Sequence, residues 1–429
     1  MSEKTAIFIV CLIFTPLLLY AQNQWVKQNY IFPENLYKVI FTDSLHGWII
    51  GDSAVIYHTS DGGENWSLQY KNPQEYIKDI YFLNNLTGWA IIWRSNYSYT
   101  SPLILSTTNA GNNWTQNFYN DTTTLPGTIY FLNQNTGFMG CAYSQSKIIK
   151  KTTNGGAIWN NVRMDSLFIA NFPVRTMNFI DSNTGFAAGG YYDMCGVIWK
   201  TTDGGEYWSV FSVGSEPLNS ISFPDYNTII ISGGDYEFGV SITTSTDRGV
   251  HWKYNLTGYF GIGYSVSFRT HSDGWISSGF SQKFLHTTDA GENWIALNTP
   301  DSSAIYSVCF PDESTGWAVG DSGSILKYTY DPIFISEDGH VLPTFKFSAY
   351  PNPFNSEINF EISLKKSGNI KLLLYDITGK KIATILNGYK REGIYILNYN
   401  ASNLSAGIYF AVLISENEII SDKKIILLK

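Results

Sequence analysis

Short stretches of alternating apolar and polar residues recur along the first three quarters of the chain. The first two are residues 39–41, followed by Gly47-Trp48, and residues 80–82, followed by Gly88-Trp89. The arrangement returns at 129–131, 177–179 and 266–268, and at 221–223 with Thr228-Ile229 in place of glycine and an aromatic residue. Alternation with a period of two, bounded by Asn, Asp, Ser and Gly, predicts short antiparallel β-strands.

A turn phrase of the form Thr-x-Asp-Gly-Gly-x-x-Trp follows these stretches, and residues 59–66 give it in full. Its Asp or Asn and its tryptophan occur six times, as Asp61 and Trp66, Asn109 and Trp114, Asn154 and Trp159, Asp203 and Trp208, Asp247 and Trp252, and Asp289 and Trp294. With Trp25, these tryptophans are spaced 41 to 49 residues apart. A period of about 40–50 residues in a β-rich chain predicts a propeller, with one four-stranded blade for each unit.

The residues of this phrase, the Asp box, are expected to be structural. Asp or Asn accepts hydrogen bonds from backbone N–H groups of its own turn, and glycine reaches positive φ at little steric cost. The tryptophan covers the hairpin with a large apolar face. Six copies at a fixed offset fit a repeated structural staple, and we expect none of them to be catalytic.

The last unit predicts how the ring closes. Residues 305–328 supply three strands and end without an Asp-box tryptophan. Residues 22–28 contain the seventh tryptophan, Trp25, and fit the missing fourth strand. We therefore expect Trp25 to pair near Tyr328, which would cover an open sheet edge and close a seven-bladed propeller over residues 22–330.

The composition changes after residue 330. Residues 331–343 lack the repeat and are interpreted as a linker. In residues 344–429, Ile358, Phe360, Ile362 and Leu364 alternate with polar residues, and further strand-like runs follow. Six or seven short strands in so short a segment predict a small Ig-like β-sandwich. The fold class expected for the whole chain is all-β.

The N-terminus has the pattern of an export signal. Lys4 precedes an apolar run from Ala6 to Tyr20, and Ala21 offers a small residue for cleavage. Residues 1–21 are therefore interpreted as a signal peptide, with export through the periplasm. We expect no membrane span in the mature chain, because no later stretch is long and apolar enough.

Charge and cysteine content narrow the choice of partners and cofactors. Residues 22–343 hold 16 basic and 28 acidic residues, which argues against nucleic acid as a partner. Cys141, Cys195 and Cys309 are widely spaced, so buried strand cysteines are favoured, with one disulfide between two of them left open. The histidines are scattered, and we expect no cofactor, no metal site and no catalytic residue.

In a propeller the variable loops lie at the end opposite the Asp-box hairpins and usually hold the site. In this chain those loops are rich in aromatic and acidic residues. The candidate binding residues are Trp93, Arg94, Tyr97, Tyr191, Tyr192, Asp193, Asp235, Tyr236 and Glu237. Rings beside amides and carboxylates suit sugar faces or peptide side chains, although such residues also serve simply to pack loops.

Two family resemblances follow from these motifs. The Gly-Trp strand followed by the Asp box is similar to the photosystem II assembly and stability factor family, and more loosely to Asp-box sialidases and sortilin-type receptors. This resemblance implies the fold. The function of the photosynthetic factors is not carried over, because they are associated with an arginine-bearing patch and this propeller has few arginines.

The second resemblance lies at the C-terminus. Residues 350–354 (Tyr-Pro-Asn-Pro-Phe), 374–380 and 404–409 resemble in order the type A sorting domain of the type IX (Por) secretion system. The resemblance implies a Bacteroidetes-like diderm bacterium, secretion or display at the cell surface, and removal of the domain by a sorting peptidase. Type IX machinery and that peptidase are then the expected partners of residues 344–429.

The expected function is that of a secreted or cell-surface binding protein, with a glycan or a protein as ligand of the aromatic loops. The alternative is an extracellular glycoside hydrolase, either sialidase-like or with two carboxylates from among Asp193, Asp235 and Glu237. A structural surface component without a small ligand is a third hypothesis.

Overall fold

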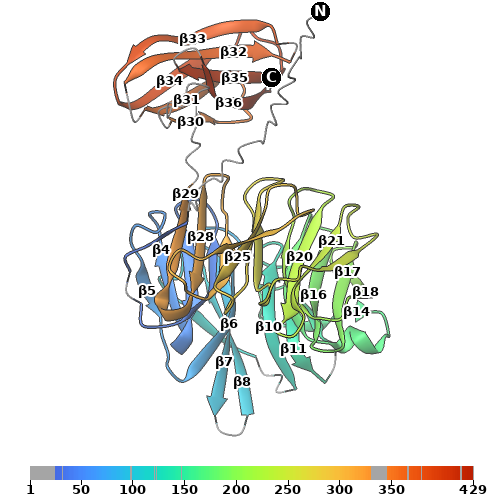
Figure 1. The fold of residues 1–429 in the computed structure, drawn as a ribbon. Helices are drawn as coiled ribbons and strands as arrows, with labels where there is room; N and C mark the ends of the chain where they lie inside the picture. Colours follow the sequence, from blue (N-terminus) through green and yellow to red (C-terminus); the bar gives the residue numbers. More distant parts are fainter. Residues whose placement is uncertain are drawn as a thin grey trace, which may run out of the picture. The chain divides into compact units, whose positions relative to one another are not determined.

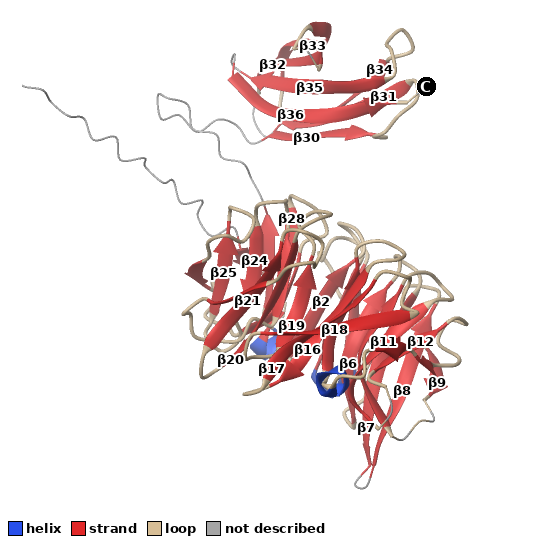
Figure 2. Cartoon of the chain, turned by 90° about the vertical axis from the view of Figure 1, so that its right-hand side faces the viewer, coloured by secondary structure: helices blue, strands red, loops and turns tan. Residues whose placement is uncertain are grey.

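The computed structural model describes residues 25–329 and 345–428, apart from residues 31, 97–98, 120, 122, 146, 365–366, 378 and 416–417. The chain divides into two compact units, residues 1–330 and 331–429. The predicted signal peptide and linker lie outside the described residues. Strands dominate both units, and the helices described are short 3-10 turns, so the all-β prediction is confirmed (Figure 2).

Seven sheets make up the described part of the first unit. Sheet 1 contains β2 (Leu36–Phe41), β3 (Gly47–Gly51), β4 (Val55–Thr59) and β5 (Ser67–Tyr70); sheet 2 contains β6 (Glu75–Phe82), β7 (Gly88–Asn96), β8 (Tyr99–Thr107) and β9 (Thr115–Phe118). Sheet 3 contains β10 (Thr124–Phe131), β11 (Gly137–Ser144), β12 (Ile149–Thr152) and β13 (Asn160–Asn161); sheet 4 contains β14 (Arg163–Met164), β15 (Val174–Phe179), β16 (Gly185–Tyr191), β17 (Cys195–Thr201) and β18 (Tyr207–Val213).

Three sheets complete the unit. Sheet 5 contains β19 (Leu218–Ser222), β20 (Ile229–Asp235), β21 (Gly239–Ser245) and β22 (Lys253–Leu256); sheet 6 contains β23 (Ser265–Phe268), β24 (Gly274–Ser277), β25 (Lys283–Thr287) and β26 (Ile295–Asn298). Sheet 7 contains β27 (Ile305–Cys309), β28 (Thr315–Gly320), β29 (Ile325–Thr329) and β1 (Trp25–Lys27). The 3-10 turns are η1 (Asp52–Ala54), η2 (Phe168–Asn171) and η3 (Asp321–Gly323).

The sheets surround a central channel of about 430 Å³. Its lining includes residues from β2, β6, β10, β15, β19, β23 and β27, which are the inner strands of the seven sheets. β28 and β29, near the end of this unit, share a buried apolar cluster with β2, β3 and β4 near its beginning (Figure 1).

The first strand of the unit is paired with the last. β1 runs antiparallel to β29, with Trp25 opposite Tyr328, as the sequence predicts. Trp25 is 2% exposed and packs against four aromatic rings, Trp275, Phe284, Phe310 and Tyr328, at centroid distances of 5.0–5.6 Å. The N-terminal strand is therefore anchored by a buried aromatic cluster as well as by backbone hydrogen bonds.

The Gly-aromatic phrase is explained by a close approach between strands of one sheet. In six sheets a glycine at or next to the start of the second strand faces the ring of a phenylalanine at the end of the inner strand or directly after it. The pairs are Gly47 with Phe41, Gly88 with Phe82, Gly137 with Phe131, Gly185 with Phe179, Gly274 with Phe268, and Gly316 with Phe310. A Cβ added to any of these glycines would lie 2.3–2.6 Å from a ring carbon, so no larger residue fits.

The aromatic residue that follows this glycine reaches the next sheet. Trp48 stacks on Phe82 of sheet 2 at 3.5 Å, and Trp89 stacks on Phe131 of sheet 3 at 3.6 Å. Trp317 of sheet 7 stacks on Phe41 of sheet 1 at 5.4 Å, so the same contact joins the last sheet to the first.

Sheet 5, which has Thr228 in place of the glycine, breaks this pattern. Its ring Phe223 meets Phe186 of sheet 4 at 6.2 Å and an interplanar angle of 58°. The stacked pairs at other sheet boundaries have interplanar angles of 6–24°.

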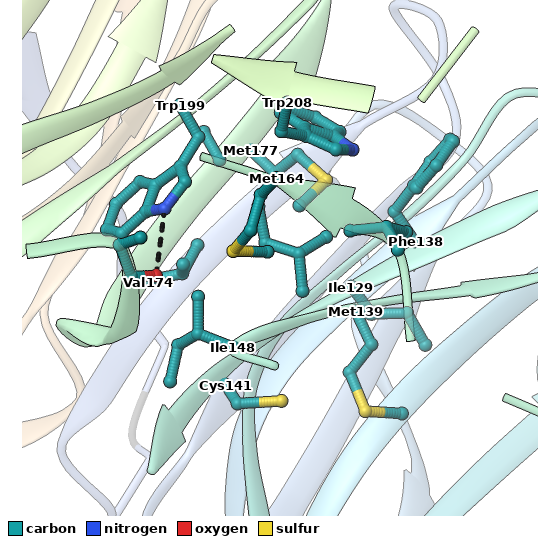
Figure 3. Close-up of a cluster of buried hydrophobic side chains, with 14 of the residues drawn as sticks. Ile129, Phe138, Met139, Cys141, Ile148, Met164, Val174, Met177, Trp199 and Trp208 are labelled. Carbon is teal, nitrogen blue, oxygen red and sulfur yellow. Dashed lines mark hydrogen bonds between the residues drawn. The ribbon is translucent and has the colours of Figure 1, made fainter. Parts of the chain in front are cut away.

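The largest cluster of buried apolar residues in the described part of the first unit spans sheets 2, 3 and 4, and Figure 3 shows part of it. Cys141, Met164, Met177 and Trp208 pack within it, and the indole of Trp199 donates a 3.2 Å hydrogen bond to the carbonyl of Ala170. Flexible methionine side chains fill the spaces between the sheets.

Cys141, Cys195 and Cys309 are free thiols, so the disulfide left open by the sequence is not formed in this structure. Cys141 is fully buried, and burial raises the pKa of its thiol to about 12. This position behaves as a small apolar core residue.

The second unit is built from two sheets. One contains β30 (Phe345–Tyr350), β31 (Glu357–Leu364) and β34 (Gly393–Asn400); the other contains β32 (Gly368–Asp376), β33 (Lys381–Lys390), β35 (Gly407–Ser415) and β36 (Glu418–Leu427). Ile358, Phe360, Ile362 and Leu364 of β31 are at most 2% exposed, as their alternation predicts, and belong to one core with apolar residues of β32 and β35.

Trp25→Ala is expected to lower the free energy of unfolding of the first unit by about 3–5 kcal/mol, because it leaves a cavity among four rings. Val26→Ala in the same strand is the control, since Val26 is 59% exposed and a change of less than about 0.5 kcal/mol is expected. Tryptophan fluorescence during chemical unfolding measures both, since all 13 tryptophans precede residue 330. Equal losses in the two variants would contradict the anchoring role of Trp25.

Gly137→Ala is expected to destabilise the first unit by about 1–3 kcal/mol, because its methyl group would overlap the Phe131 ring. Adding Phe131→Leu removes the opposing ring. The double variant should therefore be more stable than the sum of the two single losses predicts, in a double-mutant cycle measured by the same fluorescence. Strict additivity would show that the glycine is required for another reason.

Candidate functional site

The antiparallel strand order separates two ends of every sheet. Strands are counted outward from the inner strand of each sheet. Turns from the first to the second strand and from the third to the fourth lie at one end, which we call the Asp-box end. Hairpins between the second and third strands, and connections from one sheet to the next, lie at the other, which we call the loop end.

Each Asp box is held by the same hydrogen bonds. In sheet 1 the Thr59 hydroxyl donates to Asp61 Oδ1 at 2.8 Å, and the backbone N–H groups of Gly63 and Asn65 donate to Thr59 Oγ1 and Asp61 Oδ1 at 2.8 and 2.9 Å. The side-chain hydrogen bond from Asn65 is the main cause of the lowered pKa of Asp61. The arrangement recurs in sheets 2 to 6 at Asn109, Asn154, Asp203, Asp247 and Asp289.

The Asp-box tryptophans lie edge-on to phenylalanine rings at 5.9–6.1 Å. The residues so placed are Trp66, Trp114, Trp159, Trp208, Trp252 and Trp294. The rings that they contact are mainly those under the Gly-aromatic strands, so the two sequence phrases meet in space.

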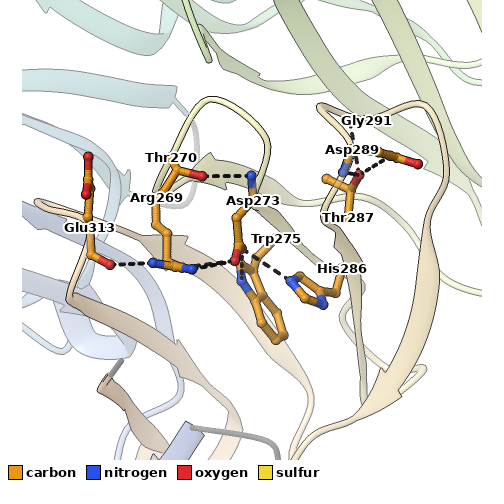
Figure 4. Close-up of polar contacts among 9 residues, drawn as sticks. All are labelled: Arg269, Thr270, Asp273, Trp275, His286, Thr287, Asp289, Gly291 and Glu313. Atoms are coloured by element: carbon orange, nitrogen blue, oxygen red, sulfur yellow. Dashed lines mark hydrogen bonds and ion pairs between the residues drawn. The ribbon is translucent and has the colours of Figure 1, made fainter. Parts of the chain in front are cut away.

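A buried polar network occupies the Asp-box end of sheet 6 (Figure 4). Asp273 accepts hydrogen bonds from Arg269 Nη2 at 2.8 Å and from the Trp275 indole at 3.0 Å, and His286 Nε2 lies 3.2 Å from its carboxylate. Burial raises the pKa of Asp273, but the hydrogen bond with His286 and the Arg269 charge outweigh it, so the net shift is downward. The network ties the turns of sheets 6 and 7 together, since Arg269 also donates to the Glu313 carbonyl at 2.7 Å.

At the loop end, two neighbouring hairpins bring candidate carboxylates together. Asp193 lies in the β16–β17 hairpin, and Asp235 and Glu237 lie in the β20–β21 hairpin. Ligand oxygens of these three side chains lie within 4.8 Å of one another. Asp235 also accepts hydrogen bonds from the backbone N–H groups of Glu237 and Phe238 at 3.0 and 2.7 Å, which fixes its hairpin.

A fourth carboxylate, Glu216, lies in the connection between sheets 4 and 5 and is 0% exposed. Its Oε2 is 3.5 Å from the backbone N of Asp193, and its Oε1 has no hydrogen-bond partner in the described part of the chain. Burial, and then the charges of Asp235 and Asp193, raise the pKa of Glu216.

The loop end also carries a pocket of about 630 Å³ lined by aromatic residues. Its lining consists of Tyr37, Tyr264, Phe280 and Tyr306, with Asn35, Asp321 and Ser322. These residues come from the ends of sheets 6, 7 and 1, so the pocket lies near the mouth of the central channel, whose lining shares its three tyrosines. We call this group the aromatic pocket.

The aromatic pocket is continuous with the second hairpin. The hydroxyl groups of Tyr236 and Tyr264 are 2.9 Å apart, and the Tyr236 ring lies 6.1 Å from that of Phe280. Tyr306 lies between Tyr264 and Phe280, at 5.3 and 5.9 Å. Burial and the hydrogen bond with Tyr236 raise the pKa of Tyr264.

The structure divides the predicted binding residues into two groups. Asp193, Asp235, Tyr236 and Glu237 converge, and Tyr192 lies beside them with its hydroxyl 3.1 Å from Arg175 Nη1. Tyr191 packs edge-on against Phe172 at 5.0 Å.

Trp93 and Arg94 belong to sheet 2 and are engaged elsewhere. The Trp93 indole donates to the Pro126 carbonyl at 2.7 Å, and Arg94 pairs with Glu75 at 2.7 Å. Tyr97, predicted beside them, lies outside the described residues.

The sequence did not single out Tyr37, Tyr264, Phe280, Tyr306 or Glu216. Three of the four rings lie at or next to the beginning of an inner strand. Aromatic residues are common in β-strands, so these three did not stand out as binding residues. Their position could have indicated them, because residues just before an inner strand, or at its first two positions, lie at the loop end.

Sheets arranged around a channel, with Asp boxes at one end, define an Asp-box β-propeller. Residues 18–329 match the family model described as photosynthesis system II assembly factor YCF48, and the chain belongs to that family. Residues 348–428 match the model of the secretion system C-terminal sorting domain, which confirms the second resemblance.

One curated relative is photosystem II assembly lipoprotein Ycf48 of Synechococcus sp. (strain CC9902), 27% identical over 124 residues. The match covers 28% of this chain and only 34% of that protein.

Two solved structures show the same fold. YCF48 bound to D1 peptide is similar with a TM-score of 0.57 at 20% identity, over 72% of this chain and 98% of that chain. The GH74 enzyme of Niastella koreensis is similar with a TM-score of 0.55 at 12% identity, over 94% of this chain and 67% of that chain. At these identities the likeness concerns the fold alone.

The sorting domain implies export by the type IX secretion system, to the cell surface or the medium, and therefore contact with that machinery. Within the described ranges, no helix combines the length and apolar character needed to cross a bilayer.

Asp273→Asn is expected to destabilise the propeller by about 3 kcal/mol near pH 6, because it leaves the Arg269 charge without its counter-charge. Since the pKa of Asp273 is lowered in the folded state, its stabilisation is present above the unfolded pKa of about 4 and is lost as the pH falls through the folded value. The difference between wild type and variant should therefore shrink on acidification below about pH 4.

Fluorescence-monitored unfolding at several pH values tests this. Glu313→Gln is the control, because Glu313 is exposed and contributes only its carbonyl to the network. If the difference in free energy of unfolding between wild type and Asp273→Asn stays constant below about pH 4, Asp273 acts through packing and not through its charge.

Proposed function

We propose that this chain is an exported binding protein whose aromatic pocket takes a glycan. The observation that carries the proposal is the pocket itself, about 630 Å³ in volume and lined by Tyr37, Tyr264, Phe280 and Tyr306. A volume of roughly 300–1,000 Å³ is typical of small-molecule sites. Phe280 is 60% exposed and Tyr37 is 42% exposed, so their rings are available to a ligand.

The chemistry of the lining favours a neutral sugar. Aromatic rings offer flat apolar faces to the C–H groups of a sugar ring. Asn35, Asp321 and Ser322 add hydrogen-bonding groups at the edge of the pocket. The acidic balance of residues 22–343 disfavours anionic ligands, so a sialylated or sulfated glycan is the less suitable choice.

A peptide is the second candidate ligand. The relative of known structure that binds the D1 peptide has the same fold. Exposed tyrosines with neighbouring amides also suit peptide side chains. Photosystem assembly is not proposed, because export to the exterior takes the protein away from a photosynthetic membrane.

Hydrolysis of the glycan is not favoured by the carboxylate geometry. Retaining glycosidases hold two carboxyl groups about 5–5.5 Å apart, and inverting enzymes about 6.5–9.5 Å apart. Asp193, Asp235 and Glu237 are not among the residues that line the aromatic pocket, and that lining contributes a single carboxylate, Asp321. We therefore propose binding without turnover.

The proposed architecture separates the ligand-binding domain from the segments used for export. The seven sheets would be the blades of one propeller over residues 22–330, with the Asp boxes as structural staples at the end opposite the ligand. Residues 344–429 would be an Ig-like β-sandwich joined by a linker at 331–343, and removed by a sorting peptidase after passage through the periplasm. Residues 1–21 would be the signal peptide.

Phe280→Ala in the full chain is expected to weaken glycan binding roughly tenfold or more, because aromatic anchors in pockets dominate such affinities. Tyr76→Ala is the matched control, since Tyr76 is 61% exposed and lies in sheet 2, outside the aromatic pocket. Arrays of plant and bacterial polysaccharides identify the ligand, and titration with it compares wild type and variants.

A release assay on the same polysaccharides decides between binding and hydrolysis. Saturable binding without released sugar supports the proposal. Released sugar that is abolished by Asp193→Asn or Asp235→Asn would establish the hydrolase instead. Binding to peptides but to no polysaccharide would show that the ligand of the pocket is a protein.

A further inference from the structure

Four carboxylates gather at the loop end of sheets 4 and 5, outside the lining of the aromatic pocket. Asp193 comes from one hairpin, Asp235 and Glu237 come from the next, and Glu216 comes from the connection between the two sheets. Within the part of the chain that the structure describes, the ion pairs formed by Lys, Arg and His use other acidic residues. The nearby Arg175 contacts Tyr192 and Asn219.

The separation of the three converging side chains suits a single cation. Calcium is bound by oxygen ligands at about 2.3–2.6 Å, so ligands on opposite sides of the ion are about 4.6–5.2 Å apart. Ligand oxygens of Asp193, Asp235 and Glu237, all within 4.8 Å of one another, fit this span. Asp235 is buried, whereas the other two are exposed, so an ion would sit at the surface and keep some of its water.

Glu216 is an independent indication that a positive charge belongs here. It is 0% exposed, yet its Oε1 has no hydrogen-bond partner among the residues that the structure describes. A buried carboxylate oxygen without a partner is unfavourable, and like charges beside it add to the cost. Its other oxygen accepts a 3.5 Å hydrogen bond from the backbone N–H of Asp193, which places the carboxylate next to one member of the cluster.

We propose that Asp193, Asp235 and Glu237 bind a calcium ion between the two hairpins, with the buried Glu216 carboxylate supplying further negative charge from behind. The ion would offset four carboxylates that otherwise repel one another. It would also link the two hairpins, which belong to different sheets. This site is separate from the proposed glycan site and does not depend on it.

The backbone of both hairpins is already shaped for ligands. Asp193 adopts a left-handed conformation with φ of 58°, which Asp and Asn tolerate better than most residues. Asp235 holds its own turn with one oxygen, Oδ1, which leaves Oδ2 for an ion. Asparagine at either position retains the backbone geometry while removing the charge, so these variants test binding and not folding.

The experiment titrates calcium into chelator-treated full-length protein by calorimetry and follows thermal unfolding with tryptophan fluorescence. One saturable site is expected, with a dissociation constant on the order of 10⁻⁴ M, typical of extracellular calcium sites. Calcium should raise the unfolding temperature. Asp193→Asn, Asp235→Asn and Glu237→Gln should each weaken binding about tenfold or more.

Glu292→Gln is the matched control, because Glu292 is an exposed acid in the Asp box of sheet 6, at the other end of the propeller. It should bind calcium like the wild type. Terbium, which replaces calcium and is excited through nearby tyrosine, gives a second readout, and the variant Tyr236→Phe should reduce that emission without removing the calcium heat.

Two results would overturn the proposal. One is the absence of saturable heat and of thermal stabilisation up to about 10 mM calcium, well above the range for such sites. The other is equal affinity in wild type and all three cluster variants, which would place the ion elsewhere. Because no sugar is present in these measurements, failure of the calcium site leaves the glycan proposal untouched, and the reverse also holds.

Discussion

Aromatic rings packed against glycine hold the first unit together. In six sheets a phenylalanine ring lies against the glycine of the neighbouring strand. The ring is so close that a Cβ atom at the glycine position would overlap it. Several of these rings also stack on a tryptophan or phenylalanine ring from the preceding sheet. Each such pair adds about 0.5–1.5 kcal/mol beyond the area it buries, and repetition around the channel makes the total large.

This packing assigns different roles to the two ends of the propeller. At the Asp-box end, hydrogen bonds within each turn hold the Asp or Asn side chain, and the tryptophan rings pack edge-on against phenylalanine. At the loop end, the connections only need to span from one sheet to the next, so their side chains are released from packing. The aromatic pocket and the carboxylate cluster both occur there, side by side through Tyr236.

Much of the fold followed from the sequence, because the repeats encode local contacts. The strands, the Asp-box turns and the pairing of Trp25 with Tyr328 depend on periodicity and on one unpaired edge. The candidate site was only half predicted. Residues 191–193 and 235–237 converge because their hairpins occupy equivalent places in adjacent sheets, whereas Trp93 and Arg94 are occupied by contacts within sheets 2 and 3. Tyr37, Tyr306 and Glu216 were missed because their exposure or burial depends on which neighbouring sheet lies beside them, which no single repeat encodes.

The exchange of strands between molecules follows from the way in which sheet 7 is assembled. Its outer strand, β1, is separated from β29 by nearly the whole length of the propeller sequence, so nothing local holds the two together. A molecule in which β1 has detached presents the bare edge of β29, and the β1 segment of a second molecule is a perfect chemical match for it. Two copies that exchange this segment would bury the same tryptophan and form the same hydrogen bonds as a single chain that closes on itself.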